Sequence, residues 1–166
     1  MLNLTRSLIT LAALALFSAS AAAQDIPAKL ALPQADTLIG KYVGKGVQIY
    51  VCRVKDAASK WTFKAPEAEL VDTQGKPFAK HYAGPTWEAS DGSKAVGKIV
   101  ASEPAPKADA IPWLLLSTET SGSGVLAGAR FVQRIDTAGG VKPSGACSTD
   151  GAEQRIDYTA DYVFYK

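Results

Sequence analysis

The sequence has few of the residues, and none of the motifs, by which most enzymes are recognised. It contains one histidine, His81, and two cysteines, Cys52 and Cys147, with no C-x-x-C pair. It has no G-x-S-x-G, no H-E-x-x-H, no phosphate loop and no dinucleotide-binding fingerprint. These absences exclude the common hydrolases, zinc proteases and nucleotide-binding enzymes that the motifs mark. The sequence therefore predicts no cofactor.

Long apolar runs and one-sided charge are also scarce. After the apolar residues 8–17 no second long apolar run follows, and 18 lysines and arginines stand against 16 acidic residues. No basic stripe marks a nucleic-acid surface. We therefore expect no nucleic-acid partner, and no contact with the membrane once the N-terminal segment has been removed.

The N-terminus has the three parts of a secretory signal. A weakly positive start with Arg6 precedes the apolar residues 8–17 and the small-residue stretch 18–23. This layout predicts a signal peptide over residues 1–23 and a secreted or periplasmic protein. The alternative is a retained membrane anchor, which the shortness of the apolar run disfavours. Removing the first 23 of 166 residues leaves 143, the usual size of one domain.

The two cysteines have two interpretations. In an oxidising compartment, Cys52 and Cys147 are best interpreted as one disulfide that closes a loop of about ninety residues. Such a bridge stabilises by roughly 4–5 kcal/mol at best in the loop-entropy model. The alternative is a pair of metal thiolates or a redox pair, which the wide spacing disfavours.

Turn residues and short β-rich runs alternate through the chain, and no segment keeps a helical period for three turns. Residues 47–54 predict a central strand with two apolar faces, and residues 156–164 alternate between apolar and polar side chains. Pro66 is expected to break the run that begins at residues 61–63. Further short strands are predicted at residues 68–72, 95–102, 111–117 and 131–137.

About eight or nine strands with turns between them predict an all-β fold. We expect a single-domain antiparallel β-sandwich or a partly closed β-barrel. Residues 24–41 contain two prolines and no sustained period, and they are interpreted as an extended N-terminal arm. The all-β domain is therefore placed at residues 42–166.

The densest group of chemically useful side chains lies in residues 81–93. His81 is a candidate general base or metal ligand, with Glu88 or Asp91 folded toward it by the Gly84-Pro85 bend. The structural alternative is an imidazole that donates to a backbone carbonyl beside a turn. Asp91 precedes Gly92, so the alternative for its carboxylate is to cap that turn.

Aromatic side chains in the same stretch give a second candidate function. Trp87, with Tyr82 nearby, is a candidate stacking platform for a sugar or another flat ligand. The alternative is that Trp87 is part of the core, where the burial of its apolar surface stabilises the fold. The candidate binding residues are His81, Tyr82, Trp87, Glu88 and Asp91.

Several blocks in fixed order resemble one known family. They are residues 46–52 (GVQIYVC), 81–88 (HYAGPTWE), 91–93 (DGS), 111–116 (IPWLLL), 133–135 (QRI), 137–140 (TAGG), Cys147 and 158–165 (YTADYVFY). The chain resembles the DUF3455 family of secreted bacterial and fungal proteins over nearly the whole mature length. The resemblance implies export, a single domain and a Cys52–Cys147 pairing. It implies no catalytic residue, because the family is functionally uncharacterised.

Three functions remain open on these grounds. The first is a binding or envelope-associated module whose candidate surface is residues 81–93, with a small molecule or an envelope polymer as partner. The second is a small hydrolase or metal-assisted enzyme that uses His81 with Glu88 or Asp91. The third is a structural exported protein without a small ligand. A concave pocket that contains His81 with a strongly shifted pKa favours an enzyme, whereas an exposed aromatic face favours a binding module.

Overall fold

The structure is a computed structural model that describes residues 25–56 and 58–166, so the predicted signal peptide lies outside the described residues. One 3₁₀ helix precedes eight strands in this part of the chain. The elements are η1 (Ala28–Leu30), β1 (Leu38–Lys55), β2 (Ala58–Val71), β3 (Pro77–Tyr82), β4 (Thr86–Ala89), β5 (Lys94–Glu103), β6 (Trp113–Ser121), β7 (Phe131–Gly139) and β8 (Glu153–Tyr165). Within these ranges, no helix has the length and apolar character that crossing a membrane requires.

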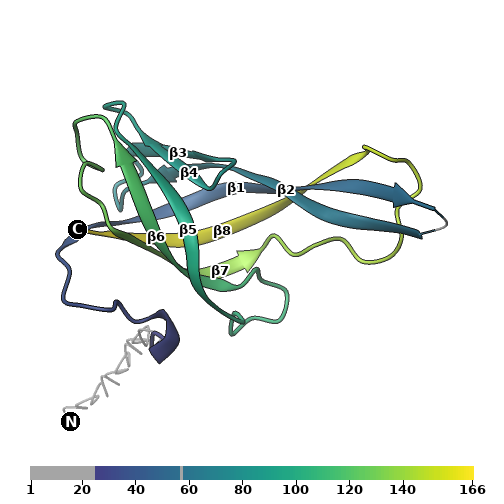
Figure 1. The fold of residues 1–166 in the computed structure, drawn as a ribbon, viewed down its shortest axis with the longest axis horizontal. Coiled ribbons are helices and arrows are strands. Elements are labelled where there is room, and N and C mark those ends of the chain that lie inside the picture. Colours follow the sequence, from purple (N-terminus) through teal and green to yellow (C-terminus); the bar gives the residue numbers. More distant parts are fainter. Residues whose placement is uncertain (1–24, 57) are drawn as a thin grey trace, which may run out of the picture.

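The eight strands form one antiparallel sheet. Each strand pairs with the next along the chain, and β1 pairs with β8 as well as with β2. The sheet therefore closes into a ring, which lies in the left half of Figure 1. The predicted all-β, antiparallel fold class is confirmed. Closure also removes the unpaired edges that an open sheet exposes to other chains.

The strands β1 and β2 are longer than the sequence pattern predicts. They extend beyond the ring as a long hairpin, at the right of Figure 1. The predicted break at Pro66 is wrong, because Pro66 pairs with Gln48 inside the continuous strand β2. Pairing of β2 with β3 begins only at Ala68, so β2 has no strand on its other side at Pro66. A residue without an N–H donor is tolerated at such a position.

One end of the ring interior is closely packed with aromatic side chains. The rings of Tyr42 and Phe78 stack with centroids 3.4 Å apart, and Phe164 packs edge-on against both. Glycine makes room for two of the large residues: a Cβ at Gly44 would lie 2.5 Å from the Tyr162 ring, and one at Gly97 would lie 2.9 Å from Trp87. The remaining fully buried members of this cluster are Leu70, Ala95, Leu126 and Val132.

The N-terminal arm covers part of the outer face of the ring. Leu30 of η1 is fully buried in a second cluster with Trp113, Leu115 and Val163, which alternate with the inward-facing residues of β6 and β8. The Leu30 carbonyl accepts a 2.7 Å hydrogen bond from Gln133 Nε2. The arm is short, because β1 begins at Leu38.

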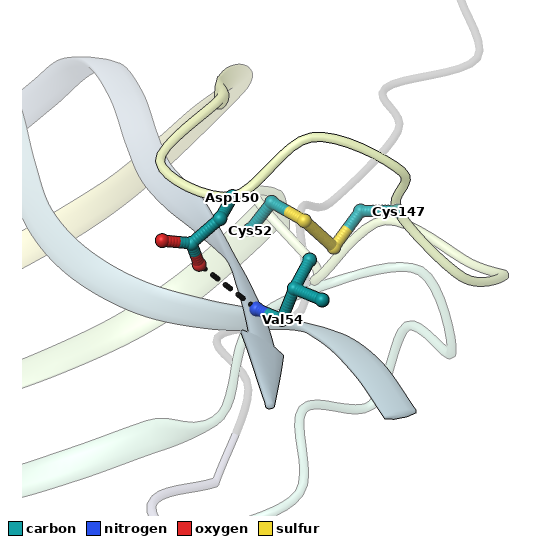
Figure 2. The surroundings of a disulfide bond; sticks show 4 residues. All are labelled: Cys52, Val54, Cys147 and Asp150. Carbon is teal, nitrogen blue, oxygen red and sulfur yellow. Dashed lines mark hydrogen bonds between the residues drawn. A yellow bond between two sulfur atoms is a disulfide. The ribbon is translucent and has the colours of Figure 1, made fainter. Parts of the chain in front are cut away.

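A disulfide joins the extended hairpin to the loop before β8. Cys52 and Cys147 are bonded, with Cα atoms 5.8 Å apart, so the disulfide interpretation of the cysteines is confirmed. Figure 2 shows the neighbouring contact, in which Asp150 Oδ1 accepts a 2.9 Å hydrogen bond from the Val54 amide. The bond and this contact fix the loop against β1.

Candidate functional site

The predicted stretch 81–93 includes the end of β3 and all of β4. The pairing of these two strands places the candidate residues on two different faces of the sheet. His81 pairs with Trp87, and Lys80 pairs with Glu88. Because successive side chains of a strand point to opposite faces, His81 and Trp87 point into the ring while Glu88 points outward. His81 and Trp87 are 2% and 1% exposed. The structure therefore separates the histidine from the nearest candidate carboxylate.

His81 is held neutral between an aromatic ring and a backbone carbonyl. Its imidazole stacks on Trp87 with ring centroids 4.7 Å apart and planes within 4°. Its Nδ1 lies 2.9 Å from the Thr86 carbonyl, which can only accept, so Nδ1 carries the proton. Burial lowers the pKa of His81 to about 4; the Thr86 hydrogen bond raises it, and the charge of Arg134 lowers it. At neutral pH the ring is uncharged, and its Nε2 is an acceptor.

The outward-facing candidates form a polar cluster on the surface. Tyr82 donates its hydroxyl proton to Glu88 Oε2 over 2.8 Å, and Lys94 Nζ lies 3.3 Å from the same oxygen. The hydrogen bond from Tyr82, together with Lys94, holds the pKa of Glu88 below its usual range. This carboxylate is therefore ionised at neutral pH and directed away from His81.

Asp91 holds two loops together. Its carboxylate accepts hydrogen bonds from the hydroxyl and amide of Ser93, at 2.6 and 2.9 Å, and from the Val125 amide at 2.7 Å. These bonds, led by the Ser93 hydroxyl, lower the pKa of Asp91. The structure does not bring Asp91 to His81, and its contacts are those of the turn-capping alternative.

A cavity of about 380 Å³ lies at the end of the ring away from the Tyr42–Phe78 stack. His81, Trp87 and Tyr162 line its inner end, and the half-exposed Phe63 and Ile99 stand where it reaches the surface. Apolar side chains from four strands and one loop make most of the wall: Phe63, Trp87, Ile99, Ile111, Leu114 and Leu116. Two of the five candidate residues, His81 and Trp87, thus belong to this cavity, whereas Tyr82, Glu88 and Asp91 do not line it.

Arg134 of β7 brings a positive charge to the cavity. It pairs with Leu114 on one side and Tyr162 on the other, and both of these residues line the cavity. Its Nε and Nη2 donate to the Pro112 carbonyl at 3.2 and 2.8 Å, which fixes the guanidinium in place. Burial raises the pKa of Tyr50 and of Tyr162, and the Arg134 charge opposes that rise; the same charge adds to the lowering of the His81 pKa by burial. Arg134 therefore acts on the interior.

A family model described as "Protein of unknown function (DUF3455)" matches residues 33–166. The chain belongs to the DUF3455 family. The family resemblance read from the sequence is confirmed, and the match covers all eight strands and every residue that lines the cavity. No curated protein and no solved structure matches the chain.

In this DUF3455 domain, two buried donors belong to residues that line the cavity and have no hydrogen-bond partner. They are Gln48 Nε2 and Trp87 Nε1. Gln48 is 2% exposed, and no acceptor lies within hydrogen-bond distance of its Nε2. A buried donor without a partner costs about 1–3 kcal/mol.

The cavity of this DUF3455 domain has positive but no negative side chains in its lining. Lys64 stands at the edge and is paired with Glu153, its Nζ 2.5 Å from Oε1. Arg134 has no carboxylate partner among the described residues. The arrangement can therefore hold an acceptor or an anion at Arg134 and apolar groups along the wall.

Sequence reasoning missed Gln48 and Arg134 as site residues. The family signature marked Gln48 without a role, and its signal is a polar side chain in the otherwise apolar run 47–52. Arg134 lies in the family block 133–135, but the sequence assigned it no role, because its inward direction depends on the register between β7 and β8.

Proposed function

We propose that this DUF3455 domain binds a small molecule in the cavity of its ring. The observation that carries the proposal is the cavity of about 380 Å³, whose wall is mostly apolar and whose lining includes the polar side chains of Gln48, His81 and Arg134. Small-molecule sites have this composition, with apolar and aromatic walls and a few polar groups that orient the ligand.

The shape of the cavity favours a small molecule over an envelope polymer as the partner. Its inner end is closed by His81, Trp87 and Tyr162, so a chain cannot pass through it. Its volume of about 380 Å³ falls in the lower part of the range found for small-molecule sites, about 300–1,000 Å³. The proposed ligand therefore enters from the side of Phe63 and Ile99.

The same proposal includes export to an oxidising compartment. The signal-like residues 1–23 support it, as does the Cys52–Cys147 bond, since disulfides persist in secreted and periplasmic proteins. The mass of the protein recovered from a periplasmic fraction tests it. We expect a chain that begins at Gln24; a full-length chain retained in the cytoplasm contradicts export.

The binding proposal is tested with N-phenyl-1-naphthylamine, a neutral apolar probe that fluoresces when it leaves water. Ile99 and Val100 are adjacent in β5 and almost equally exposed, at 58% and 57%, but only Ile99 lines the cavity. We expect Ile99→Trp to narrow the opening and weaken binding of the probe at least tenfold. Val100→Trp is the control and leaves the affinity at the wild-type value.

Two results overturn the proposal. One is the absence of any saturable rise in fluorescence with the wild-type protein. The other is equal affinity of both tryptophan variants for the probe, because binding then occurs elsewhere on the surface.

A further inference from the structure

We propose that the ligand is a small monocarboxylate with an apolar body, whose carboxylate is held by Arg134. This inference rests on the proposed function and names the class of molecule that the same cavity takes. Arg134 supplies the charge, and the wall of Leu114, Leu116 and Trp87 supplies the apolar contact.

The geometry of Arg134 leaves donors free for a ligand. A guanidinium has five N–H donors in a planar fork, and two of its nitrogens donate to the Pro112 carbonyl. At least two N–H groups remain, and a carboxylate is the acceptor whose spacing matches such a fork. The bond to Pro112 orients the guanidinium before a ligand arrives, so little side-chain freedom is lost on binding.

The single positive charge of the site favours a ligand with one negative charge. Arg134 has no carboxylate partner among the described residues, and Lys64 is paired with Glu153. His81 is uncharged at neutral pH, because burial lowers its pKa, and so it adds no second cation. A dianion such as a phosphate monoester would leave one charge without a partner beside an apolar wall, which costs free energy. A monoanion balances the single guanidinium.

The test compares a carboxylate with its neutral isostere. Naphthalene-1-acetate and naphthalene-1-acetamide share the same ring system and differ in charge at one end. Each is titrated against the wild-type protein by displacement of N-phenyl-1-naphthylamine. We expect the acid to bind at least about tenfold more tightly than the amide, in line with the strength of hydrogen bonds to charged groups.

Substitutions at two arginines test whether Arg134 causes the preference for the acid over the amide. In Arg134→Gln, which keeps a donor for the Pro112 carbonyl, the ratio of the two affinities falls to about one. Arg53 is an exposed residue of β1 outside the cavity, and Arg53→Gln removes the same charge from the protein. In this control the ratio keeps its wild-type value.

The outcomes separate the two proposals. Equal binding of acid and amide to the wild type, or a ratio that survives in folded Arg134→Gln, overturns the carboxylate inference and leaves the binding site standing. A wild-type protein that binds none of the three compounds overturns both. If circular dichroism shows that Arg134→Gln does not fold, Arg134→Lys decides: we expect a reduced preference with a point charge, and an undiminished one contradicts a role for the fork.

Discussion

The two ends of the ring share the same eight strands, yet one is filled and the other is hollow. At the filled end, Tyr42, Phe78 and Phe164 stack or pack edge-on. At the hollow end, the cavity of about 380 Å³ is bordered by Gln48 and Arg134. Protein interiors usually reach the packing density of organic crystals, so the filled end is the ordinary case.

The two ends contribute differently to stability and to the proposed function. Unfilled space and unpartnered donors both lower stability, because lining atoms lose contacts and Gln48 Nε2 and Trp87 Nε1 lose hydrogen bonds. The cavity lies at one end, and the packed rings of Tyr42, Phe78 and Phe164 fill the other. The filled end is the part that holds the fold, and the hollow end is the part that we propose holds a ligand.

The largest expected effect comes from releasing the loop beside the hollow end. Replacement of Cys52 and Cys147 by serine frees a loop of 95 residues in sequence separation. The loop-entropy model predicts a loss of about 4–5 kcal/mol in the free energy of unfolding, measured by urea denaturation. Wild-type protein treated with reductant is the matched control and should show the same loss. Equal stability of the variant and the oxidised wild type contradicts this prediction.

A pair of leucine truncations compares the two ends directly. Leu70 is fully buried at the filled end, and Leu114 forms part of the cavity wall. Leu70→Ala should cost about 4 kcal/mol and Leu114→Ala about 2 kcal/mol, because a residue beside an existing cavity has fewer contacts to lose. Urea denaturation of both variants measures the difference. A larger loss for Leu114→Ala would mean that the cavity end is the better packed one.

The pH dependence of stability tests the buried state of His81. Its pKa is lowered to about 4 in the folded protein against 6.5 unfolded, so the unfolded chain binds more protons between these values. The stability from the neutral ring is present above pH 6.5 and is lost as pH falls toward 4. The advantage of wild type over His81→Gln should shrink by about 3 kcal/mol between pH 7 and pH 4. A constant difference contradicts the burial of a neutral imidazole.

The smallest effect is expected on the outer face of the β3–β4 hairpin. Glu88 is bonded to Tyr82 and Lys94 at the surface, where water screens the charges. Glu88→Gln should leave the melting temperature and the affinity for N-phenyl-1-naphthylamine unchanged. Loss of probe binding in this variant would show that the binding site involves the outer face of residues 81–93.

Much of the fold follows from local pattern. In β8 the predicted alternation is confirmed at Tyr158, Ala160 and Tyr162, which are buried, while Asp157 and Thr159 are exposed. Local pattern does not reveal ring closure, because closure depends on the pairing of β1 with β8 across the whole chain. Nor does it reveal that Pro66 lies where only one neighbouring strand is present.

The candidate site was predicted only in part. The sequence drew attention to His81 and Trp87 because rare residues crowd together there, and both line the cavity. It could not show that Tyr82 and Glu88 lie on the opposite face of the sheet, because the face of each residue follows from the hairpin register. Arg134 was missed because it lies about fifty residues further along the chain and reaches the cavity only through sheet closure.

We expect the ligand to bind at the hollow end, beside Trp87. The protein has three tryptophans, and the indole N–H signals of Trp61, Trp87 and Trp113 can be followed separately by ¹H–¹⁵N NMR. Trp113 lies in the outer cluster and Trp61 in the extended hairpin, so they are internal controls. On addition of naphthalene-1-acetate, we expect a saturable shift of the Trp87 signal that exceeds the shifts of the other two. A shift at Trp61 or Trp113 with Trp87 unmoved would contradict it.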